Sequence, residues 1–405
     1  MSSSSSCAKP EFPKGAIVSG YEVIKKLGSG GFGAVYHVRK NGLDAALKTE
    51  FVMDDRQTLR NEVHMLRLAQ WSNSFCRIYC SKRLKFEDQK VNIMVMSLCG
   101  RPLSRLRRMM PERRFTKSTA TRVSRQILTA LRDLHKTGIL HRDVKASNCG
   151  WHAPSRSILL FDLGFSRKFL EVDPNTKKLK HRTARKSAGF LGTSKYCSLN
   201  AHDEMDQGRR DDLWAWLYTT AEFYLGSLPW SNENNTHLMS TKKIKVGSKL
   251  FMKCPREIYT IYEHIKALKF ESCPDYQKMF RQFDQISSRY EIEVSDPFDF
   301  ELGSAHYEKY FANKQTDSEK EDTLDESLTD GDDTKADRVV DLDTAPDLNE
   351  SAEVITLNSS GPTSPKSKSS NDRLNYNRLT AGLNRAFNKV FQRPRRWIMN
   401  DTNPK

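Results

Sequence analysis

The chain has 405 residues, of which 37% are hydrophobic and 29% charged, and its mean hydropathy is -0.67. These values are typical of a soluble protein with room for a large core, and no apolar run approaches the ~20 residues that span a bilayer. The opening, a methionine followed by five serines, has no apolar stretch, so we expect neither a secretory signal nor membrane attachment. The expected location is the cytoplasm, with the nucleus as an alternative.

The formal net charge of +16 is divided unevenly along the chain. Residues 1–315 carry 53 basic and 33 acidic side chains, and residues 365–405 carry 10 basic and 2 acidic ones. Between them lies an acidic segment, residues 316–350, with 14 acidic side chains against 3 basic ones. Such asymmetry indicates acidic or polyanionic partners, among which nucleic acid is only one class.

Eight cysteines occur without any Cys-x-x-C pair, which argues against a zinc site. Cys76 and Cys80 stand close together, but no second pair of cysteine or histidine ligands follows at suitable spacing. In a reducing compartment we expect all eight to be free thiols with packing roles.

The first 20 residues are rich in serine and include Pro10 and Pro13, which predicts a flexible arm. A folded body is predicted over residues 21–300. Its first part favours strands, because short β-prone runs are separated by glycines and by Asn41-Gly42, a dipeptide suited to a two-residue hairpin turn. The elements predicted there are strands over 21–27, 34–39 and 45–49, a helix over 57–70 and a strand over 91–97.

Helical periodicity dominates the second part of the body. The helices predicted there cover residues 117–135, 211–225 and 256–270. A β-rich N-terminal lobe followed by a helical C-terminal lobe is an α+β arrangement with a cleft between the two.

The remainder of the chain has a different composition. Residues 301–370 lose hydrophobic content and are predicted to be a disordered, acidic tail rich in Ser and Thr. Residues 371–405 combine apolar positions at helical spacing with basic charge. They predict an amphipathic helix that packs in a partner's groove or on the chain itself, in preference to a membrane surface.

A glycine cluster, Gly28-Ser29-Gly30-Gly31-Phe32-Gly33-Ala34-Val35, fits the pattern G-x-G-x-x-G-x-V. The same glycines would suit a dinucleotide-binding turn or a merely flexible hairpin. A dinucleotide turn opens a helix, however, whereas these glycines precede a predicted strand, so they lie in a hairpin. Because glycine has no Cβ, the hairpin can lie close over phosphates with its N–H groups turned toward them.

Lys48 ends the third predicted strand in an apolar setting. It is either a lysine that extends its charge to the surface or a cation that holds the α- and β-phosphates of a nucleotide. The second role needs a carboxylate on the following helix. Glu62 is favoured over Asp54 and Asp55, which precede the helix proper.

The most specific pattern is His141-Arg142-Asp143-Val144-Lys145-Ala146-Ser147-Asn148, followed by Asp162-Leu163-Gly164. Asp143 can accept the proton of an attacking hydroxyl, and Lys145 can neutralise a transferred phosphoryl group. Asn148 and Asp162 supply hard oxygen ligands of the kind that Mg²⁺ prefers. With the upstream glycines and lysine, the pattern indicates phosphoryl transfer from MgATP.

From Tyr21 to about Phe300 the sequence resembles a eukaryotic protein kinase, which implies a bilobal protein kinase fold. Finer features resemble the casein kinase 1 superfamily, nearest its tau-tubulin kinase branch or divergent relatives of that branch. Those features are Gly192-Thr193-Ser194-Lys195-Tyr196-Cys197-Ser198-Leu199-Asn200, Arg209-Arg210-Asp211-Asp212-Leu213-Trp214, Gly226-Ser227-Leu228-Pro229-Trp230, Cys273-Pro274-Asp275-Tyr276 and Phe298-Asp299-Phe300.

The resemblance implies an active serine/threonine kinase that uses ATP and Mg²⁺, with Asp212 anchoring the catalytic loop. Leu163 departs from the family's phenylalanine but keeps an apolar contact. Lys195 replaces the family's arginine in the anion-binding position, so a point charge stands in place of a bidentate fork. The residues that the resemblance assigns to the ATP site are Leu27, Gly28, Gly30, Gly31, Gly33, Val35, Lys48, Glu62, Met96 and Leu98.

Basic residues gather around the expected substrate groove, and Lys195, Lys242 and Lys245 are the candidates for binding an anionic group of a substrate. They predict acidic or phosphorylated Ser/Thr substrates, with a merely solvated basic face as an equal alternative. The acidic segment carries Ser and Thr among its carboxylates, so it either docks on the basic body and is phosphorylated by it or is an inert, solubilising tail.

Two other classes of function compete with an active kinase. A non-catalytic kinase-fold scaffold that binds acidic partners would usually lack one of Lys48, Asp143 and Asp162, and the chain keeps all three. A nucleic-acid-binding protein would explain the basic body, but it predicts aromatic stacking residues or a known binding fold, and neither is evident. We therefore expect no nucleic acid partner, and we expect a monomer.

Overall fold

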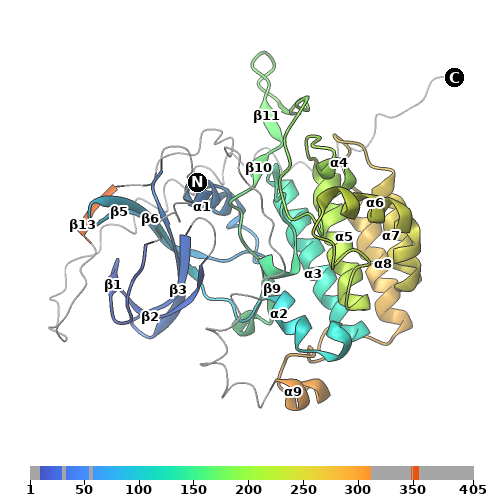
Figure 1. Ribbon diagram of the computed structural model, residues 1–405, viewed down its shortest axis with the longest axis horizontal. Coiled ribbons are helices and arrows are strands. Elements are labelled where there is room, and N and C mark those ends of the chain that lie inside the picture. The colour runs from blue at the N-terminus through green and yellow to red at the C-terminus, as the bar shows by residue number, and fades with distance from the viewer. Residues whose placement is uncertain (1–9, 30–32, 54–57, 312–347, 349, 355–405) are drawn as a thin grey trace, which may run out of the picture. The chain divides into compact units, whose positions relative to one another are not determined.

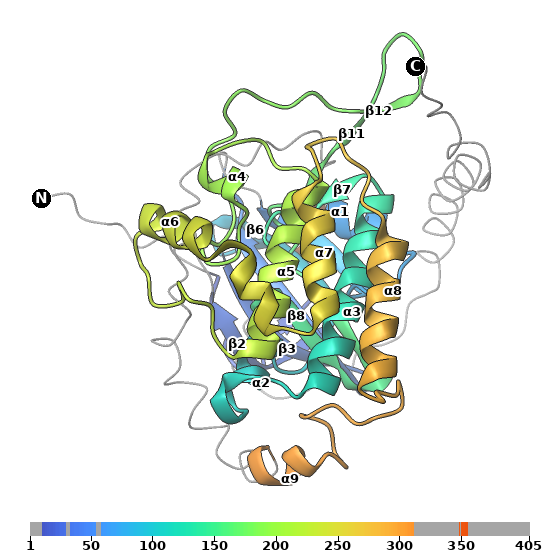
Figure 2. The same ribbon diagram turned by 90° about the vertical axis from the view of Figure 1, so that its right-hand side faces the viewer.

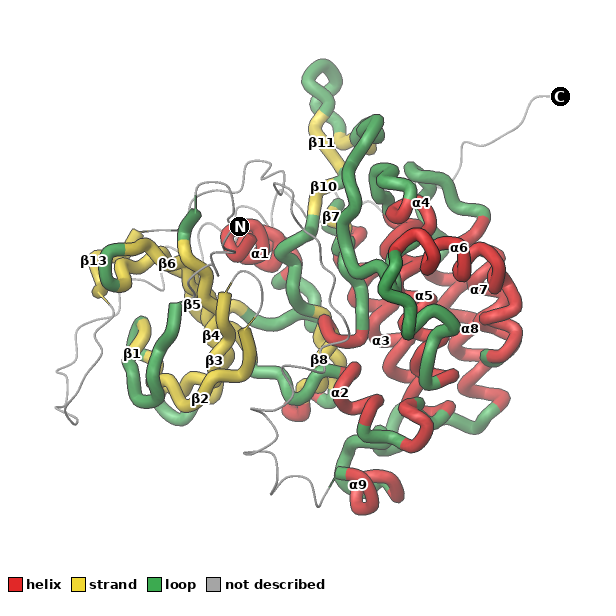
Figure 3. The backbone as a smooth tube through the Cα atoms, in the orientation of Figure 1, coloured by secondary structure: helices red, strands yellow, loops and turns green. Residues whose placement is uncertain are grey.

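The computed structural model describes residues 10–29, 33–53, 58–311, 348 and 350–354. All of these belong to one compact unit, residues 1–357. Within this unit a sheet-rich lobe stands beside a helical lobe (Figures 1 and 3). The bilobal α+β arrangement predicted from the sequence is confirmed.

The sheet-rich lobe is built on a seven-stranded sheet with the order β1-β2-β3-β4-β6-β5-β13. Its strands are β1 (Ile17–Val18), β2 (Tyr21–Ser29), β3 (Gly33–Lys40), β4 (Leu43–Phe51), β5 (Ile78–Phe86), β6 (Gln89–Ser97) and β13 (Glu350–Val354). Three short antiparallel pairs complete the strands. They are β7 (Ile139–Leu140) with β10 (Arg167–Lys168), β8 (Cys149–His152) with β9 (Ser157–Leu160), and β11 (Leu170–Val172) with β12 (Leu179–His181).

One long helix packs on the sheet, and the other helices build the second lobe. The α-helices are α1 (Thr58–Ala69), α2 (Leu103–Arg108), α3 (Lys117–Lys136), α4 (Leu199–His202), α5 (Arg209–Leu225), α6 (Thr236–Val246), α7 (Arg256–Lys266), α8 (Tyr276–Arg289) and α9 (Ala305–Tyr310). Short 3-10 helices cover Pro111–Arg113, Ala146–Asn148, Ala153–Ser155 and Gly247–Lys253.

β3 and β4 form the hairpin expected at Asn41-Gly42, where both residues have left-handed φ angles of 50° and 79°. Alternate side chains of β3 point into a small apolar core, because Ala34, Tyr36 and Val38 are all buried. This period of two is the property of a half-buried strand. It explains why the sequence predicts the strand correctly.

The N-terminal arm packs on this lobe from residue 10 onward, in contrast to the flexible arm expected over residues 1–20. Phe12 is only 5% exposed, and its ring lies against those of Tyr36 and Phe86. The Tyr36 hydroxyl donates to the carbonyl of Pro10 at 2.8 Å. Burial of one aromatic ring and the pairing of β1 with β2 therefore attach this part of the arm.

α3 and α5 form the centre of the helical lobe, with α7 and α8 packed beside them (Figure 2). α5 is buried on all sides, as expected of a central helix. Its Trp216 is fully buried and donates from Nε1 to the carbonyl of Ser124 on α3 at 3.0 Å. α7 ends at Lys266, before the predicted end at residue 270, because the chain turns there and the Leu268 N–H donates to Ile265.

The Phe298-Asp299-Phe300 motif closes the helical lobe. The Asp299 carboxylate accepts hydrogen bonds from the N–H and the hydroxyl of Thr116 at 2.8 and 2.7 Å. Thr116 is the N-cap of α3, so Asp299 fixes the start of the longest helix. Phe298 and Phe300 lie against each other and against Trp151.

Two described segments after residue 300 differ from the disordered tail expected over residues 301–370. α9 follows the closing motif, and β13 pairs in parallel with β5. Leu348, just before β13, is 3% exposed. The rest of the expected tail and the amphipathic segment over residues 371–405 lie outside the described residues, as do residues 1–9.

In the described ranges, no helix is both long and apolar enough to cross a membrane. The described cysteines are free thiols, as expected, while Cys7 falls outside those ranges. The same part of the chain contains no group of three His, Cys, Asp or Glu side chains that could hold a metal ion.

Candidate active site

A cavity of about 660 Å³ lies where the two lobes meet, within the size range of sites for small ligands. Most of the residues predicted for the ATP site and for catalysis line it. These are Leu27, Gly28, Gly33, Val35, Lys48, Glu62, Met96, Leu98, Asp143, Lys145 and Asp162. Gly30 and Gly31 lie outside the described residues. Ala46 and Cys99 also line the cavity, and the sequence analysis missed both. The available signals were the position of Ala46 two residues before Lys48 and that of Cys99 two residues after the end of β6.

Gly33 allows two strands to approach closely at the mouth of this cavity. A Cβ atom at this position would lie 1.8 Å from the carbonyl oxygen of Thr49 on β4. Since Thr49 pairs with β3 through its backbone, that oxygen has no room to move. The last glycine of the motif is thus required by the close approach of β3 to β4. The sequence analysis gave a different reason for the glycines, their approach to phosphates, which stays a prediction.

Lys48 holds together the two carboxylates that the sequence placed near it. Its Nζ donates to Glu62 Oε2 at 2.7 Å and to Asp162 Oδ1 at 2.9 Å. Burial alone would lower the pKa of Lys48, but the charges of Asp162 and Glu62 outweigh burial and raise it above its usual range. Burial raises the pKa of Glu62 to about 7 against the opposing charge of Lys48. Lys48 therefore stays a cation facing the cavity.

Asp162 and Asn148 fit a magnesium ion in their chemistry. Burial would raise the pKa of Asp162, but Lys48 lowers it below its usual range, so the carboxylate stays ionised. Asn148 donates through Nδ2 to the carbonyl and the carboxylate of Asp143 at 2.9 and 3.2 Å, which leaves its amide oxygen able to accept or to ligate. An ionised carboxylate and an amide oxygen are a hard ligand pair.

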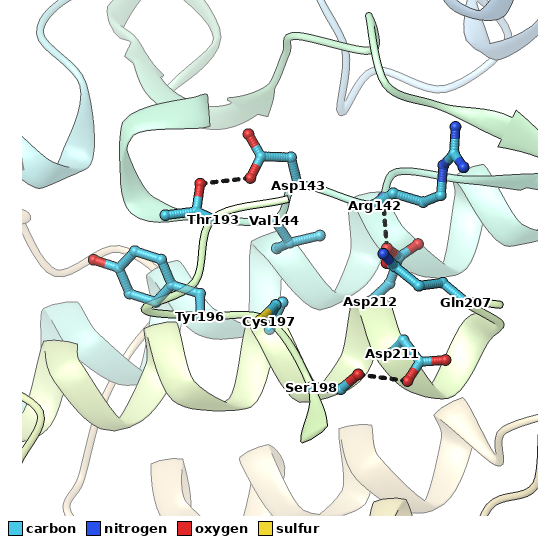
Figure 4. Close-up of a pocket in the computed structure, with 11 residues that line it drawn as sticks. Arg142, Asp143, Val144, Thr193, Tyr196, Cys197, Ser198, Gln207, Asp211 and Asp212 are labelled. Atoms are coloured by element: carbon cyan, nitrogen blue, oxygen red, sulfur yellow. Dashed lines mark hydrogen bonds between the residues drawn. The ribbon is translucent and has the colours of Figure 1, made fainter. Parts of the chain in front are cut away.

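Asp143 is held in a hydrogen-bonded group with Thr193 and Lys145. The Thr193 hydroxyl donates to Asp143 Oδ1 at 2.7 Å (Figure 4). Lys145 Nζ lies 3.2 Å from Asp143 Oδ2 and donates to Thr193 Oγ1 at 2.9 Å. A carboxylate and an ammonium group thus lie together at one edge of the cavity. There the carboxylate could accept the proton of an attacking hydroxyl, while the ammonium group balances the charge of the transferred phosphoryl group.

Asp212 on α5 anchors the loop that carries Asp143. Its carboxylate accepts from the backbone N–H of His141 at 2.8 Å and from that of Arg142 at 2.7 Å, the second of which Figure 4 shows. Burial would raise the pKa of Asp212, but the hydrogen bond from His135 and the one from the His141 N–H lower it below its usual range. The two backbone hydrogen bonds hold Arg142 at its left-handed φ of 68°, and the anchoring role expected of Asp212 fits this geometry.

A half-buried tyrosine, which the sequence analysis treated only as part of a motif, extends this anchor. His135 lies between Asp212 and Tyr276, with Nε2 2.8 Å from the Asp212 carboxylate and Nδ1 in hydrogen-bond contact with the tyrosine hydroxyl. Because the hydroxyl can donate to Nδ1, Nε2–H is directed at the carboxylate. The Cys273-Pro274-Asp275-Tyr276 motif therefore contacts the support of the catalytic loop.

The comparisons with known proteins agree with this geometry. Residues 21–285 match the protein kinase domain. The chain belongs to the protein kinase family. A solved structure titled vaccinia related kinase 3 has a similar fold, with a TM-score of 0.58 at 17% identity over 70% of this kinase and 93% of that chain.

Three curated relatives of the kinase are named as serine/threonine-protein kinases. One from Dictyostelium discoideum is 33% identical over 299 residues, which are 72% of this chain and 58% of that relative. One from Caenorhabditis elegans is 32% identical over 298 residues, covering 71% and 84%. Another from the same nematode, spe-6, is 30% identical over 298 residues, covering 69% and 75%. This kinase thus spans less than two thirds of the first relative's length.

Lys195, one of the predicted anion-binding residues, lies in an ion pair inside the domain. Lys195 Nζ lies 2.8 Å from Glu222 Oε1, and only 13% of its side chain is exposed. Arg107 and the Tyr196 hydroxyl contact the same carboxylate at 3.2 and 2.8 Å. Lys195 therefore packs inside the domain as part of the segment that follows Asp162-Leu163-Gly164, residues 165–200, which we call the activation segment. Its predicted binding of a substrate's anionic group stays a prediction.

The two other anion-binding candidates lie on α6. Lys242 Nζ lies 2.8 Å from Glu233, and Lys245 is exposed. Between them Lys243 is buried and donates to the carbonyls of Ser194 and Cys197, both at 2.7 Å. α6 thus fastens the activation segment and turns two lysines outward beside it.

An arginine cluster lies beside the catalytic loop. The sequence analysis placed Arg182 and Arg185 among the basic residues near the substrate groove, but it did not predict that they meet Arg142. Asp206 accepts from Arg182 Nη2 at 2.8 Å and from Arg185 Nη2 at 3.1 Å, and these bonds hold its pKa well below the usual range although burial acts in the opposite direction. Burial and the charges of three neighbouring arginines lower the pKa of Arg142 to about 9. The members of the cluster are Arg142, Arg167, Arg182 and Arg185. Asp206 pairs with two of these guanidinium groups, and no spacing in the sequence predicts the cluster.

Proposed function

We propose that this kinase is an active serine/threonine kinase that transfers the γ-phosphate of ATP to acidic or pre-phosphorylated protein substrates. The observation that carries the proposal is the joint placement of two groups at one cavity. The first is Lys48 with Glu62 and Asp162. The second is Asp143 with Lys145. A non-catalytic scaffold would need neither group in this arrangement.

In the proposed reaction, Asp143 accepts the proton of the substrate hydroxyl as its oxygen forms a bond to the γ-phosphorus of ATP. The bond from that phosphorus to the bridging oxygen of the β-phosphate breaks, and ADP leaves. Lys145 lies beside Asp143 and balances the charge of the transferred group. Lys48, held by its two carboxylates, positions the phosphates of ATP. Asp162 and Asn148 would hold Mg²⁺, which when bound supplies charge neutralisation at the phosphates. Transfer then depends mainly on positioning and electrostatics.

The preference for acidic substrates is supported by the arginine cluster. Arg142 belongs to the catalytic loop, so one guanidinium group of the cluster is carried by the residue directly before the proposed base Asp143. Guanidinium groups pair with carboxylates and phosphates through two parallel hydrogen bonds, which favours anionic residues near the acceptor. Lys242 and Lys245 on α6 add positive charge beside the activation segment.

The finer placement in the casein kinase 1 superfamily is also part of the proposal. It is supported by the Gly192-Thr193-Ser194-Lys195-Tyr196 sequence and by the closing motifs. Within that sequence the Thr193 hydroxyl donates a hydrogen bond to Asp143, and Lys195 forms an ion pair with Glu222. The acidic segment is proposed to be a substrate of its own kinase domain, since it carries Ser and Thr among carboxylates. The location is proposed to be cytoplasmic or nuclear, and the state monomeric.

Substrate choice is testable with two peptides that share a Ser acceptor and differ only in acidic or basic flanking residues. We expect the acidic peptide to have the higher kcat/KM. Replacement Arg185→Ala should raise KM for the acidic peptide about fivefold to tenfold, in line with the loss of one charge-assisted pair, and leave the basic peptide unchanged. The matched variant Arg125→Ala, which removes an exposed arginine of α3 outside the cluster, should change neither. Equal turnover of both peptides would contradict the proposed preference.

A further inference from the structure

The edge of the sheet at β5 is covered by the chain's own tail. β13 pairs in parallel with β5, in a register that sets Glu350 opposite Arg83 and Val354 opposite Lys85. Figure 1 shows β13 at the outer end of the sheet, beside β5. Leu348, two residues before the strand, is 3% exposed and belongs to the apolar core. After Phe311, the described residues of the chain all lie in this one attachment.

The two paired strands carry opposite charges. β5 contains Lys82, Arg83 and Lys85 and no acidic residue. β13 contains Glu350 and Glu353 and no basic residue. Arg83 Nε donates to Asn92 Oδ1 on β6 at 3.1 Å, which holds the guanidinium group on the sheet beside the edge. The register therefore brings an acidic strand to a basic edge, and opposite charges across a strand pair are stabilising.

We propose that the β5 edge is a docking site for acidic β-strands and that residues 348–354 of the same chain occupy it. Strand addition gains affinity from main-chain hydrogen bonds, and the flanking side chains select the partner. Leu348 is the apolar anchor, and the basic residues of β5 select for acidic sequence. An uncovered edge would offer the same main-chain groups to other proteins.

The attachment has a consequence for the acidic segment, residues 316–350. The chain leaves the helical lobe after Phe311, which is 3% exposed, and returns to the sheet-rich lobe at Leu348. Residues 312–347 can reach at most ~120 Å when extended, so both ends are fixed on one kinase domain with ample length to reach the cavity. A tether of this kind makes an encounter intramolecular, at an effective concentration of the order of millimolar. This step rests on the proposed kinase function and deepens it, because it makes the acidic segment a substrate in cis.

Docking is tested by hydrogen–deuterium exchange on the full chain carrying Asp143→Asn, which requires no catalysis. We expect peptides from residues 78–86 and 348–354 to exchange about tenfold more slowly than in a variant whose residues 348–354 are replaced by Gly and Ser. Arg83→Glu and Glu350→Arg should each speed exchange in both peptides, and the two together should restore protection. Lys136→Glu, an equal charge change on α3, should have no effect.

Equal exchange of residues 348–354 in the parent chain and in the Gly/Ser variant would overturn the docking site. Faster exchange that the charge swap fails to restore would overturn selection by charge. The consequence in cis has its own measurement in the active chain, where phosphate incorporation into the acidic segment should be independent of protein concentration. In the Glu350→Arg variant it should slow several-fold and become concentration-dependent while an acidic peptide is still phosphorylated at the parent rate. Concentration-dependent incorporation in the parent chain would overturn the cis step.

Discussion

Replacement Asp143→Asn is expected to lower kcat about 10³-fold, within the range of the contribution of a positioned general base. Asparagine keeps the shape and can still accept from the Thr193 hydroxyl, which lies 2.7 Å away. It cannot take the proton of the substrate hydroxyl. The KM for ATP should change less than about threefold, because Lys48 and its carboxylates hold the phosphates. Steady-state kinetics with an acidic peptide provides both numbers.

A control separates this effect from damage to the fold. Thr193→Ser keeps a hydroxyl for Asp143 and Lys145, so its kcat should stay within about tenfold of the parent chain. Circular dichroism and thermal melting of Asp143→Asn should match the parent. Activity of Asp143→Asn within tenfold of the parent would contradict the assignment of Asp143 as the base.

Replacement Glu222→Gln is expected to cost about 3–5 kcal/mol of unfolding free energy, the usual result of removing one partner from a buried charged group. Glu222 is 1% exposed and contacts Lys195 and Arg107 at 2.8 and 3.2 Å. The neutral amide would leave both cations uncompensated inside the domain. Chemical denaturation of the parent and the variant measures the difference.

Two further variants test the same interpretation. Asp284→Asn removes an exposed pair with Arg125 and should change stability little, because exposed ion pairs are weak. The double variant Glu222→Gln with Lys195→Met should recover part of the loss, since one uncompensated charge is removed. A parent-like midpoint for Glu222→Gln would instead favour the predicted role of Lys195 in binding substrate anions.

Local patterns account for most of what the sequence predicts. The period of two in β3 and the glycine pattern locate the hairpin, and Gly33 is required there by its contact with Thr49. Lys48 and Glu62 are found because one ends a strand and the other lies within the predicted helix. Asp143 and Asp162 are found because their spacing within a motif is specific. In each case the signal lies within a few residues of the functional group.

The errors and omissions arise where a partner lies far away in the sequence. Lys195 forms an ion pair with Glu222 on α5, 27 residues along the chain, and no local sequence pattern predicts that contact. The arginine cluster forms only when the activation segment folds back onto Arg142. The arm is attached at residue 10 because Phe12 is buried against Tyr36. The Ser-rich composition of the arm gives no sign of the apolar area that this one ring buries.

β13 shows the same limit in a different form. Its sequence has the low hydrophobic content and high charge of a disordered segment, which is what local reasoning reports. The pairing of β13 depends on the outer edge of β5. The sequence analysis did not predict β5 as a strand, because Lys82, Arg83 and Lys85 obscure its apolar positions. The acidic residues of β13 and the basic residues of β5 predict this pairing only when the two segments are considered together.

The most direct test of the account is transfer of labelled phosphate by the purified full-length chain from γ-labelled ATP with Mg²⁺ to a protein substrate with acidic Ser/Thr sites. The account predicts label on serine or threonine in the substrate and in residues 316–350, with the Asp143→Asn chain at background. Label in neither, with parent and variant indistinguishable while the chain is folded, would contradict the central claim that this cavity catalyses phosphoryl transfer.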